Sequence, residues 1–357
     1  MKELPFEQQF SLFAPLDYRE TQTIEQNINM FESKEAAVEY YFRAYREMGY
    51  PNYDISQYDP ESELAALRRI DSSAIIKDGV AVQTMLGCGF LWCFFPHWID
   101  CKTFNDGSLR DNWEDDAKLR NMMEKTVDWC LKHESGRMST NRVRQLAKVY
   151  LCKQAPSNFR PTVSKAIYDI YGNHGNVYDP CGGWGGRLFG FLASDCREYV
   201  CCDPSTLTAN GLNELYDKCR GWVHKSVIIN CECQEDYKPK CGHFDLVFTS
   251  PPYFDCERYS DEPTQSYIRY PTVIKWCAGF LEPLISNAYD ALKPGGRFVL
   301  NIANTKNAPQ LEELSLIFAD MAGFKLEDTL KLTLSSIAGK GVKYEPMFVF
   351  KKAGDTP

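Results

Sequence analysis

The sequence has no apolar run long enough to cross a lipid bilayer, and its first residues lack the basic-then-apolar pattern of a secretion signal. Its most apolar stretch, residues 85–98, is shorter than a membrane span and is interrupted by cysteine, proline and histidine. We therefore expect a protein of the cytoplasm, or of an equivalent reducing compartment. With 357 residues, 44% of them hydrophobic, the chain can bury the core of one large or two ordinary domains.

The chain also lacks any C-x-x-C pair, although it has fifteen cysteines. These cysteines are scattered through predicted helices and strands of a chain too large to need disulfides, so we expect reduced and mostly buried thiols. Cys231, Cys233, Cys241 and His243 could supply four ligands to zinc, but their C-x-C and C-x-H spacings are not those usual for zinc. We predict no metal site, and zinc at this cluster stays open as the alternative.

Positive charge is also scarce, because 40 basic residues face 48 acidic ones and the formal charge is −8. A phosphate-bearing partner requires local rather than net positive charge, and residues 132–165 contain eight basic residues and one acid. Within them, residues 139–150 have the pattern of a capped helix, with Arg142, Arg144 and Lys148 expected to face outward. The predicted phosphate contacts are Arg137, Arg142, Arg144, Lys148 and Lys340. The alternative is a solvated helix face whose charges bind nothing.

Glycine, by contrast, is concentrated at residues 182–186, directly after the apolar segment 176–178 and Asp179. Such a run allows an abrupt strand-to-helix turn and a close approach of the backbone to a ligand, as in nucleotide-binding doubly wound sheets. A second predicted strand, residues 199–202, ends in Asp203, where such sheets place an acid that accepts hydrogen bonds from both ribose hydroxyls. The sequence therefore predicts a cofactor with a ribose at this edge of a sheet.

The tetrapeptide Ser250-Pro251-Pro252-Tyr253 ends a further predicted strand, residues 246–249. Two consecutive prolines have no backbone N–H, so the local carbonyls are left to accept hydrogen bonds from outside the strand. Ser250 adds a hydroxyl acceptor and Tyr253 adds a flat ring. This combination suits a planar ring with an exocyclic amine, such as adenine or cytosine taken out of a base stack.

Residues 156–357 resemble the S-adenosylmethionine-dependent DNA amino-methyltransferases, with a broad likeness to phage-encoded members. The resemblance rests on D-P-x-x-G-x-G at 179–185 followed, in the right order and spacing, by S-P-P-Y at 250–253. Two segments extend it: residues 158–162 are similar to the family's cofactor-tail motif, and residues 343–350 are similar to its last strand.

The resemblance implies a Rossmann-like class I methyltransferase fold of the α/β class, with a seven-stranded, mostly parallel sheet. It implies S-adenosylmethionine as cofactor and double- or single-stranded DNA as partner, in a bacterial or phage-infected cell. The implied catalytic residues are Ser250, Pro251, Pro252 and Tyr253. The implied cofactor-binding residues are Asp179, Pro180, Gly182, Gly183, Gly185, Asp203, Phe159, Arg160 and Thr162. Asp236, in the loop after residues 226–230, is a further candidate that could accept a hydrogen bond from the cofactor's adenine amine, and the alternative is a surface charge.

The target base stays open. Serine at the first position of the tetrapeptide resembles the cytosine-N4 enzymes, whereas the glycine turn precedes the tetrapeptide here and so departs from the order common in that group. Alternative readings are an RNA guanine-N2 or protein glutamine methyltransferase, which generally have Asn or Asp in place of Ser250, or a cofactor-binding scaffold without activity.

We expect a mainly helical region over residues 1–155 and the catalytic domain over residues 156–357. We expect the aromatic stretch 90–98 to lie in the core. We also expect one long crossover helix over residues 266–292. The sequence does not indicate an oligomeric state. The predicted strands are 176–178, 199–202, 226–230, 246–249, 297–302, 326–334 and 347–351.

Overall fold

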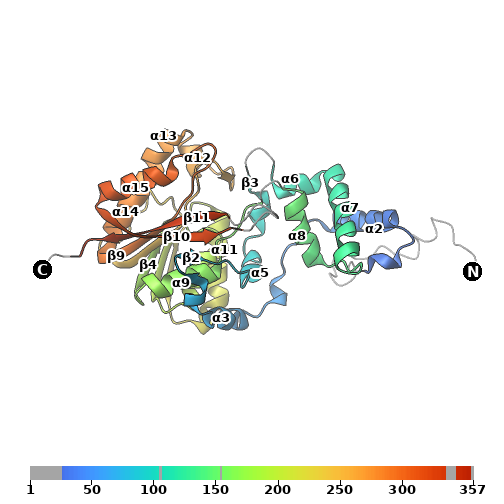
Figure 1. Ribbon diagram of the computed structural model, residues 1–357, viewed down its shortest axis with the longest axis horizontal. Helices are drawn as coiled ribbons and strands as arrows, with labels where there is room; N and C mark the ends of the chain where they lie inside the picture. The colour runs from blue at the N-terminus through green and yellow to red at the C-terminus, as the bar shows by residue number, and fades with distance from the viewer. Residues whose placement is uncertain (1–25, 104–106, 153–154, 335–342, 355–357) are drawn as a thin grey trace, which may run out of the picture. The chain divides into compact units, whose positions relative to one another are not determined.

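The computed structural model describes residues 26–103, 107–152, 155–334 and 343–354 (Figure 1). These residues group into two compact units. The first is formed by the described parts of Met1–Pro51 and Asn105–Ala155, and the second by those of Asn52–Phe104 and Pro156–Pro357. This division differs from the expected one between residues 155 and 156, because residues 52–103 group with the second unit.

The first unit is helical, as expected for this part of the chain. Its longer helices are α2 (Lys34–Met48), α6 (Leu109–Glu114), α7 (Asp116–His133) and α8 (Thr140–Tyr150), preceded by a 3₁₀ turn at Ile28–Met30. The first turns are capped by short polar side chains: Ser33 accepts a hydrogen bond from the amide of Ala36, and Ser139 accepts one from that of Arg142. The Trp113 ring lies edge-on to Tyr45 and Tyr50 and fills the space between the helices.

A large sheet forms the centre of the second unit, with nine strands among the described residues. In chain order these are β1 (Ile76–Lys77), β2 (Val80–Ala81), β4 (Asn176–Asp179), β5 (Glu198–Cys202), β6 (Ser226–Asn230), β7 (Phe244–Thr249), β9 (Leu292–Asn301), β10 (Phe324–Thr333) and β11 (Tyr344–Lys352). Across the sheet the order is β1-β2-β10-β11-β9-β7-β4-β5-β6. Strands β4, β5, β6, β7 and β9 run parallel, and β11 runs antiparallel to both of its neighbours.

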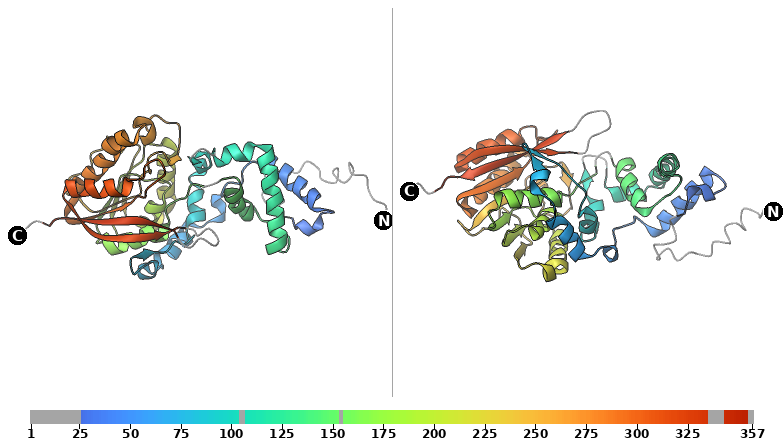
Figure 2. Two further views of the ribbon diagram at one scale, coloured as in Figure 1. Left: turned by 45° about the horizontal axis from the view of Figure 1, so that its top comes forward. Right: turned by 60° about the horizontal axis from the view of Figure 1, so that its bottom comes forward.

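All seven expected strands are present, and the α/β Rossmann-like sheet of the class I methyltransferase type is confirmed. The expected count of seven is wrong for the whole sheet, since β1 and β2 extend it beyond β10. Val80 pairs with Lys331, and the amide of Gln83 donates to the Thr333 hydroxyl across 250 residues of chain. Figure 2 shows this blue segment beside the red C-terminal strands. Two-residue strands have no periodicity to detect in a sequence.

Helices cover both faces of the sheet. They are α3 (Pro60–Arg68), α4 (Ser72–Ile75), α5 (Cys88–Trp92), α9 (Pro161–Tyr171), α10 (Gly186–Ala193), α11 (Thr206–Cys219), α12 (Ser266–Arg269), α13 (Val273–Trp276), α14 (Glu282–Ala291) and α15 (Leu311–Ala322), with 3₁₀ turns at Ile55–Gln57, Pro96–Asp100 and Arg220–Trp222. Figure 1 shows α13, α14 and α15 on one side of the sheet and α3 and α9 on the other.

The single helix expected over residues 266–292 is wrong. The chain instead forms α12, α13, a π-helical turn at Cys277–Leu281 and then α14. Pro271 explains the first break, because the residue before a proline avoids the helical conformation and the proline has no N–H to donate. Pro283 occupies the first turn of α14, where that missing N–H is tolerated.

The aromatic stretch at residues 90–98 lies in the core, as expected. Phe90, Phe95 and Trp98 are at most 1% exposed. Phe90 packs against Phe189 of α10 with ring centroids 5.3 Å apart, and Trp92 packs against Trp184 at 5.5 Å. Residues before 104 therefore build part of the wall behind the glycine turn.

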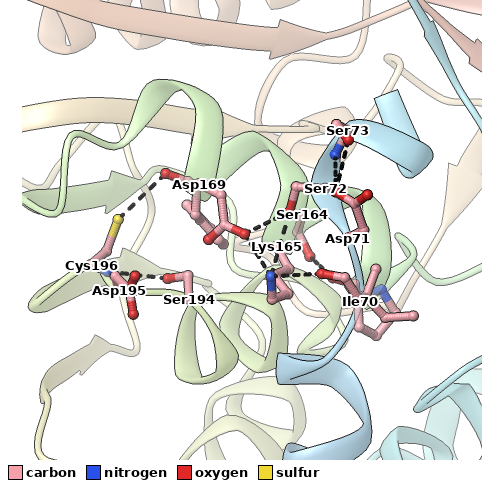
Figure 3. A network of polar contacts seen from close by, with 12 residues as sticks. Ile70, Asp71, Ser72, Ser73, Ser164, Lys165, Asp169, Ser194, Asp195 and Cys196 are labelled. Atoms are coloured by element: carbon pink, nitrogen blue, oxygen red, sulfur yellow. Dashed lines mark hydrogen bonds and ion pairs between the residues drawn. The ribbon is translucent and has the colours of Figure 1, made fainter. Parts of the chain in front are cut away.

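A buried lysine also joins the segment 52–103 to the sheet-bearing part of the chain (Figure 3). Lys165 of α9 is 6% exposed, and its Nζ donates to the Ile70 carbonyl at 3.2 Å and to the Asp169 carboxylate at 2.6 Å. Ser72 donates to the same carboxylate at 2.6 Å. The charge of Lys165 is thus directed into the protein.

The close packing of α9 on α10 depends on Gly190. A Cβ built there would overlap the Ser164 hydroxyl and lie 2.7 Å from the backbone nitrogen of Lys165. We expect Gly190→Ala to lower the free energy of unfolding by about 2 kcal/mol or more, because one of the two helices must move. The matched control is Gly221→Ala, where a Cβ meets nothing within 4 Å. Urea unfolding midpoints check this, and equal midpoints for the two variants contradict it.

Candidate active site

Three strand ends meet at one edge of the sheet. Strand β4 lies between β5 and β7 and runs parallel to both, so Asp179, which ends β4, and Asp203 and Ser250, which directly follow β5 and β7, lie at the carboxyl ends of adjacent strands. This is the edge at which open α/β sheets bind their ligands.

The glycine turn after β4 combines one open position with tightly packed ones. Gly183 has φ of 58°, and the nearest atom to a Cβ built there lies 3.7 Å away. Gly185 has φ of 73° and begins α10. A Cβ on Gly186 would overlap the Phe159 carbonyl. Packing therefore accounts for Gly186, whereas the backbone at Gly183 leaves room for a ligand.

Asp179 is completely buried, and its carboxylate accepts hydrogen bonds from three surrounding side chains. Arg187 Nε donates at 2.7 Å, the Tyr199 hydroxyl at 2.7 Å and the Thr249 hydroxyl at 2.9 Å. Arg187 is also buried, and it donates further to the Cys181 carbonyl. Asp179 therefore joins the ends of β4 and β7 to the first turn of α10, and all of these carboxylate contacts are internal.

Asp203 is held by backbone amides and remains partly exposed. Gly183 donates to its Oδ2 at 2.9 Å and Ser205 donates to its Oδ1 at 3.1 Å. Each carboxylate oxygen accepts two hydrogen bonds, so one position on each is left for a ligand. Burial raises the pKa of Asp203 to about 6, against the lowering effect of the two amides.

The expected cofactor-tail segment lies along the glycine turn. Asn158 Nδ2 donates to the Trp184 carbonyl at 2.5 Å, and the half-buried Phe159 ring packs on Phe248. Arg160 is engaged with Gln83 at 3.0 Å. Thr162 is fully buried and accepts from Thr84. Pro180 and Gly182 are buried within the turn.

Asp236 follows β6, and its carboxylate faces Arg269 in a two-point ion pair. Arg269 Nη1 and Nη2 lie 2.7 and 3.2 Å from the Asp236 oxygens, and this guanidinium lowers the pKa of Asp236. Arg269 also contacts the more buried Glu235 at 2.9 Å. A role for Asp236 toward the cofactor stays a prediction.

The tetrapeptide after β7 is surrounded by polar partners from two other strands. Ser250 Oγ donates to Asn301 Oδ1 at 3.2 Å, and the Tyr253 hydroxyl donates to Glu345 Oε2 at 3.3 Å. The following residue, Phe254, has φ of 60°, a backbone strain that is concentrated at functional sites. Sequence reasoning missed Asn301 and Glu345. The available signal was a polar residue at the end of each otherwise apolar strand segment.

The loop after the tetrapeptide returns to the glycine turn. Glu257 and Arg258 form the short strand β8 (Glu257–Arg258), which pairs with β3 (Lys102–Thr103) in a separate two-stranded ribbon. The Tyr259 ring lies edge-on to Trp184 with centroids 5.4 Å apart, and its hydroxyl bonds to Glu257. Burial raises the pKa of Glu257. The loop thus links the tetrapeptide to the glycine turn.

The predicted phosphate contacts of α8 differ from one another in the structure. Arg144 is 7% exposed and donates to the Pro51 carbonyl at 2.7 Å, so the expectation that it faces outward is wrong. Position 144 lies at the flank of the buried helix face, and the chain near Pro51 covers that flank. Arg142 is paired with Glu134 and lies over the Trp129 ring.

The other predicted phosphate contacts differ in exposure. Arg137 is exposed and Lys148 is half-buried. Lys340 lies outside the described residues.

The cysteine cluster at residues 231–243 lies in the part of the chain that the structure describes. In that part of the chain no three His, Cys, Asp or Glu side chains are grouped to hold a metal ion. Cys231 and Cys241 are exposed, whereas Cys233 is buried and donates to the Thr264 carbonyl at 3.4 Å. None of the described helices has the length and apolar character needed to span a membrane.

Comparison with models of protein families and with curated protein sequences gives no match. Solved structures with a similar arrangement include a SAM-dependent O-methyltransferase from Thermotoga maritima, which is 14% identical over 59% of this chain and 72% of that chain, with a TM-score of 0.35. M. jannaschii TYW2 in complex with AdoMet is 14% identical over 57% and 80%, with a TM-score of 0.37.

A third similar structure, tRNA (m1A58) methyltransferase TrmI from Aquifex aeolicus, is 14% identical over 56% of this chain and 72% of that chain, with a TM-score of 0.37. At these scores the likenesses have no bearing on function. The fold assignment rests on the strand order and directions described above.

The buried Asp179–Arg187 pair is expected to control the stability of this edge. Asp179→Asn leaves the Arg187 guanidinium buried without a counter-charge, and we expect the free energy of unfolding to fall by about 3–5 kcal/mol. Asp320→Asn, which removes an exposed pair with Lys325, is the control and should leave the urea midpoint unchanged. A midpoint for Asp179→Asn within error of the parent protein would show that the pair is dispensable.

Proposed function

We propose that this protein is a methyltransferase that uses S-adenosylmethionine to methylate the exocyclic amino nitrogen of a nucleobase in DNA, at cytosine N4 or adenine N6. The proposal is carried by one observation: the hydrogen bond between Thr249 and Asp179. Thr249 directly precedes Ser250, and Asp179 directly precedes the glycine turn, so this bond holds the amine-accepting tetrapeptide beside the predicted cofactor loop.

The residues at the glycine turn fit a nucleoside cofactor. Asp203 has one acceptor position left on each carboxylate oxygen, which matches the two hydroxyls of a ribose. The open side of Gly183 permits close approach of the ligand to the backbone. When bound, S-adenosylmethionine supplies a sulfonium methyl group that is already electrophilic. The protein then needs no activated nucleophile or metal, only alignment of the accepting nitrogen and exclusion of water.

The tetrapeptide fits the acceptor. Ser250 Oγ and the Pro251 carbonyl can accept the two hydrogens of an amino group, which favours a nitrogen whose lone pair points away from its ring. Tyr253 offers a face on which an extruded base can stack. Extrusion costs a few kcal/mol in a duplex and less in a single strand. We expect the loop that contains Tyr259, whose ring packs on Trp184, to cover the two sites together.

RNA and protein remain the alternative substrates, because an amino group of guanine or an amide of glutamine satisfies the same acceptors. A non-catalytic scaffold would have no use for an ordered tetrapeptide bonded to two neighbouring strands. The methylated polymer is therefore the quantity to measure.

Methyl transfer from labelled S-adenosylmethionine is expected to double-stranded or single-stranded DNA, with N4-methylcytosine or N6-methyladenine in the nucleoside digest. Ser250→Ala should lower kcat by about 10²- to 10³-fold, because one acceptor for the amino group is lost. Tyr253→Ala should raise KM by roughly 5- to 100-fold through lost stacking. Ser315→Ala, a buried serine of α15 that bonds the Leu311 carbonyl, is the control and should keep full activity.

Label in RNA or protein and none in DNA would reassign the substrate while keeping the reaction type. If no polymer is labelled although the cofactor binds, the protein is better described as a cofactor-binding scaffold without activity.

Cofactor binding is expected to depend on pH through Asp203. Because its folded-state pKa is raised to about 6, the carboxylate that accepts the ribose hydroxyls is present above that pH and is lost as the pH falls through it. The dissociation constant should be flat from pH 7 to 8 and rise by up to about tenfold per unit below pH 6. Calorimetric titration of parent protein and Asp203→Asn, whose affinity should be weak and independent of pH, checks this. A flat profile for the parent protein would remove Asp203 from the ribose site.

A further inference from the structure

Asn301 connects the tetrapeptide to the neighbouring strand through two hydrogen bonds of opposite sense. It ends β9, pairs in register with Met347 of β11 and is 2% exposed. Its Nδ2 donates to the Pro346 carbonyl at 3.1 Å, and its Oδ1 accepts from Ser250 Oγ at 3.2 Å.

The Pro346 contact fixes the orientation of the Asn301 amide. A carbonyl oxygen can only accept, so the amide atom that faces Pro346 must be the nitrogen, and the atom that faces Ser250 must be the oxygen. The single hydrogen of the Ser250 hydroxyl is therefore directed to Asn301. What remains on Ser250 Oγ is its lone pairs, which only accept.

The second hydroxyl of the tetrapeptide is committed in the same way. The Tyr253 hydroxyl donates to Glu345, which lies next to Pro346 on the same strand. Burial raises the pKa of Tyr253 well above its ordinary value, so the phenol keeps its hydrogen for this bond. The Ser250 hydroxyl also lies close to the phenol oxygen, and the hydrogen bond that it donates is the one to Asn301.

The chain adds no donor from the prolines that separate these two residues. Pro251 and Pro252 have no N–H, so the tetrapeptide presents two carbonyls and a hydroxyl oxygen that accepts. A ring substituent with hydrogens to donate satisfies these acceptors. A ring carbonyl at the same place would meet oxygen lone pairs and leave buried groups unpaired.

We propose that Asn301 is a positioning residue that makes Ser250 an obligate hydrogen-bond acceptor and so selects an amino-bearing base over its carbonyl-bearing counterpart. This rests on the proposed function for the identity of the ligand as a nucleobase. The discriminated pairs are cytosine over uracil, or adenine over hypoxanthine, which differ at the exocyclic substituent and the ring proton beside it.

The test measures binding and not methyl transfer. The full-length protein is titrated, in the presence of S-adenosylhomocysteine, with single-stranded oligonucleotides that carry one cytosine or one uracil, and one adenine or one hypoxanthine, in the same context. The parent protein is expected to prefer the amino base of one pair by about 10- to 100-fold.

Two substitutions at Asn301 separate positioning from a structural role. Asn301→Leu removes the acceptor and frees the Ser250 hydroxyl to donate, so the preference should fall below about threefold. Asn301→Asp keeps an oxygen for the Ser250 hydroxyl and should keep most of the preference. A purely structural role would weaken both oligonucleotides of a pair alike and leave their ratio unchanged in both variants.

The matched control is Asn287→Leu. Asn287 is a buried asparagine of α14 whose Nδ2 donates to the Gln234 carbonyl at 3.4 Å, so the substitution makes the same chemical change elsewhere in the same unit. Its base preference should equal that of the parent protein.

Three outcomes overturn the proposal: no preference in the parent protein, an unchanged preference in Asn301→Leu, or equal loss in Asn301→Asp and Asn301→Leu. If Asn301→Leu does not fold, the parent protein decides the first outcome, and loss of the preference in Asn301→Asp while Asn287→Leu keeps it overturns the proposal. If the oligonucleotides are methylated but bound without preference, this inference alone is wrong. If no oligonucleotide is bound or methylated, the proposed function is wrong as well.

Discussion

The buried carboxylate of Asp179 is the constraint on which the rest of the site depends. A charge without exposure is tolerated only where it is paired and fully hydrogen-bonded, and Arg187, Tyr199 and Thr249 meet that condition from three different elements. Arg187 lies on α10, Tyr199 on β5 and Thr249 on β7. The ends of β4 and β7 and the start of α10 are therefore fixed relative to one another. This arrangement also positions the glycine turn and the tetrapeptide, which directly follow these strand ends.

Internal hydrogen bonds also determine which atoms of Asp203 and Ser250 remain available to a ligand. Backbone amides of Gly183 and Ser205 occupy one position on each oxygen of Asp203, and Asn301 takes the hydrogen of Ser250. In both cases an internal partner determines which positions are left for a ligand. An acid with two acceptors left suits a diol, and a hydroxyl reduced to an acceptor suits an amine.

The sequence predicted the strands of the sheet and the ends that form the site, because strand periodicity, glycine concentration and paired prolines are local signals. It could not predict what depends on distant partners. Asn301 and Glu345 act through contacts with residues about 50 and 90 positions away. Each is a polar residue in an otherwise apolar strand, but the neighbouring sequence does not identify its partner. The two-residue strand β1 pairs with β2, and β2 pairs with β10, which lies far along the chain; the short sequences of β1 and β2 have no pattern of their own.

The misassigned features have equally specific causes. Arg144 was expected outside because helical periodicity defines the centre of a buried face better than its flanks, and the chain near Pro51 covers that flank. The expected long helix is interrupted at Pro271, because a proline disfavours the helical conformation of the residue before it. The expectation had followed the usual length of a crossover helix instead. Asp203 and the tetrapeptide kept their expected neighbours, because parallel strands bring their carboxyl ends to one edge whatever the helices between them do.

The distribution of charge bears on how a nucleic acid would be held. Arg142 is paired with Glu134, Lys165 is paired with Asp169, and Arg144 donates to the Pro51 carbonyl, so three of the eight basic residues between 132 and 165 are engaged within the protein. Basic side chains that are already engaged within the protein contribute little to the salt-dependent affinity typical of DNA-binding proteins. Under the proposed function, nucleic-acid binding by a chain with a net charge of −8 rests more on the base pocket than on the backbone of the polymer. A pocket that recognises an unpaired base through acceptors and stacking is suited to that balance, since an unpaired base enters it without the cost of opening a duplex.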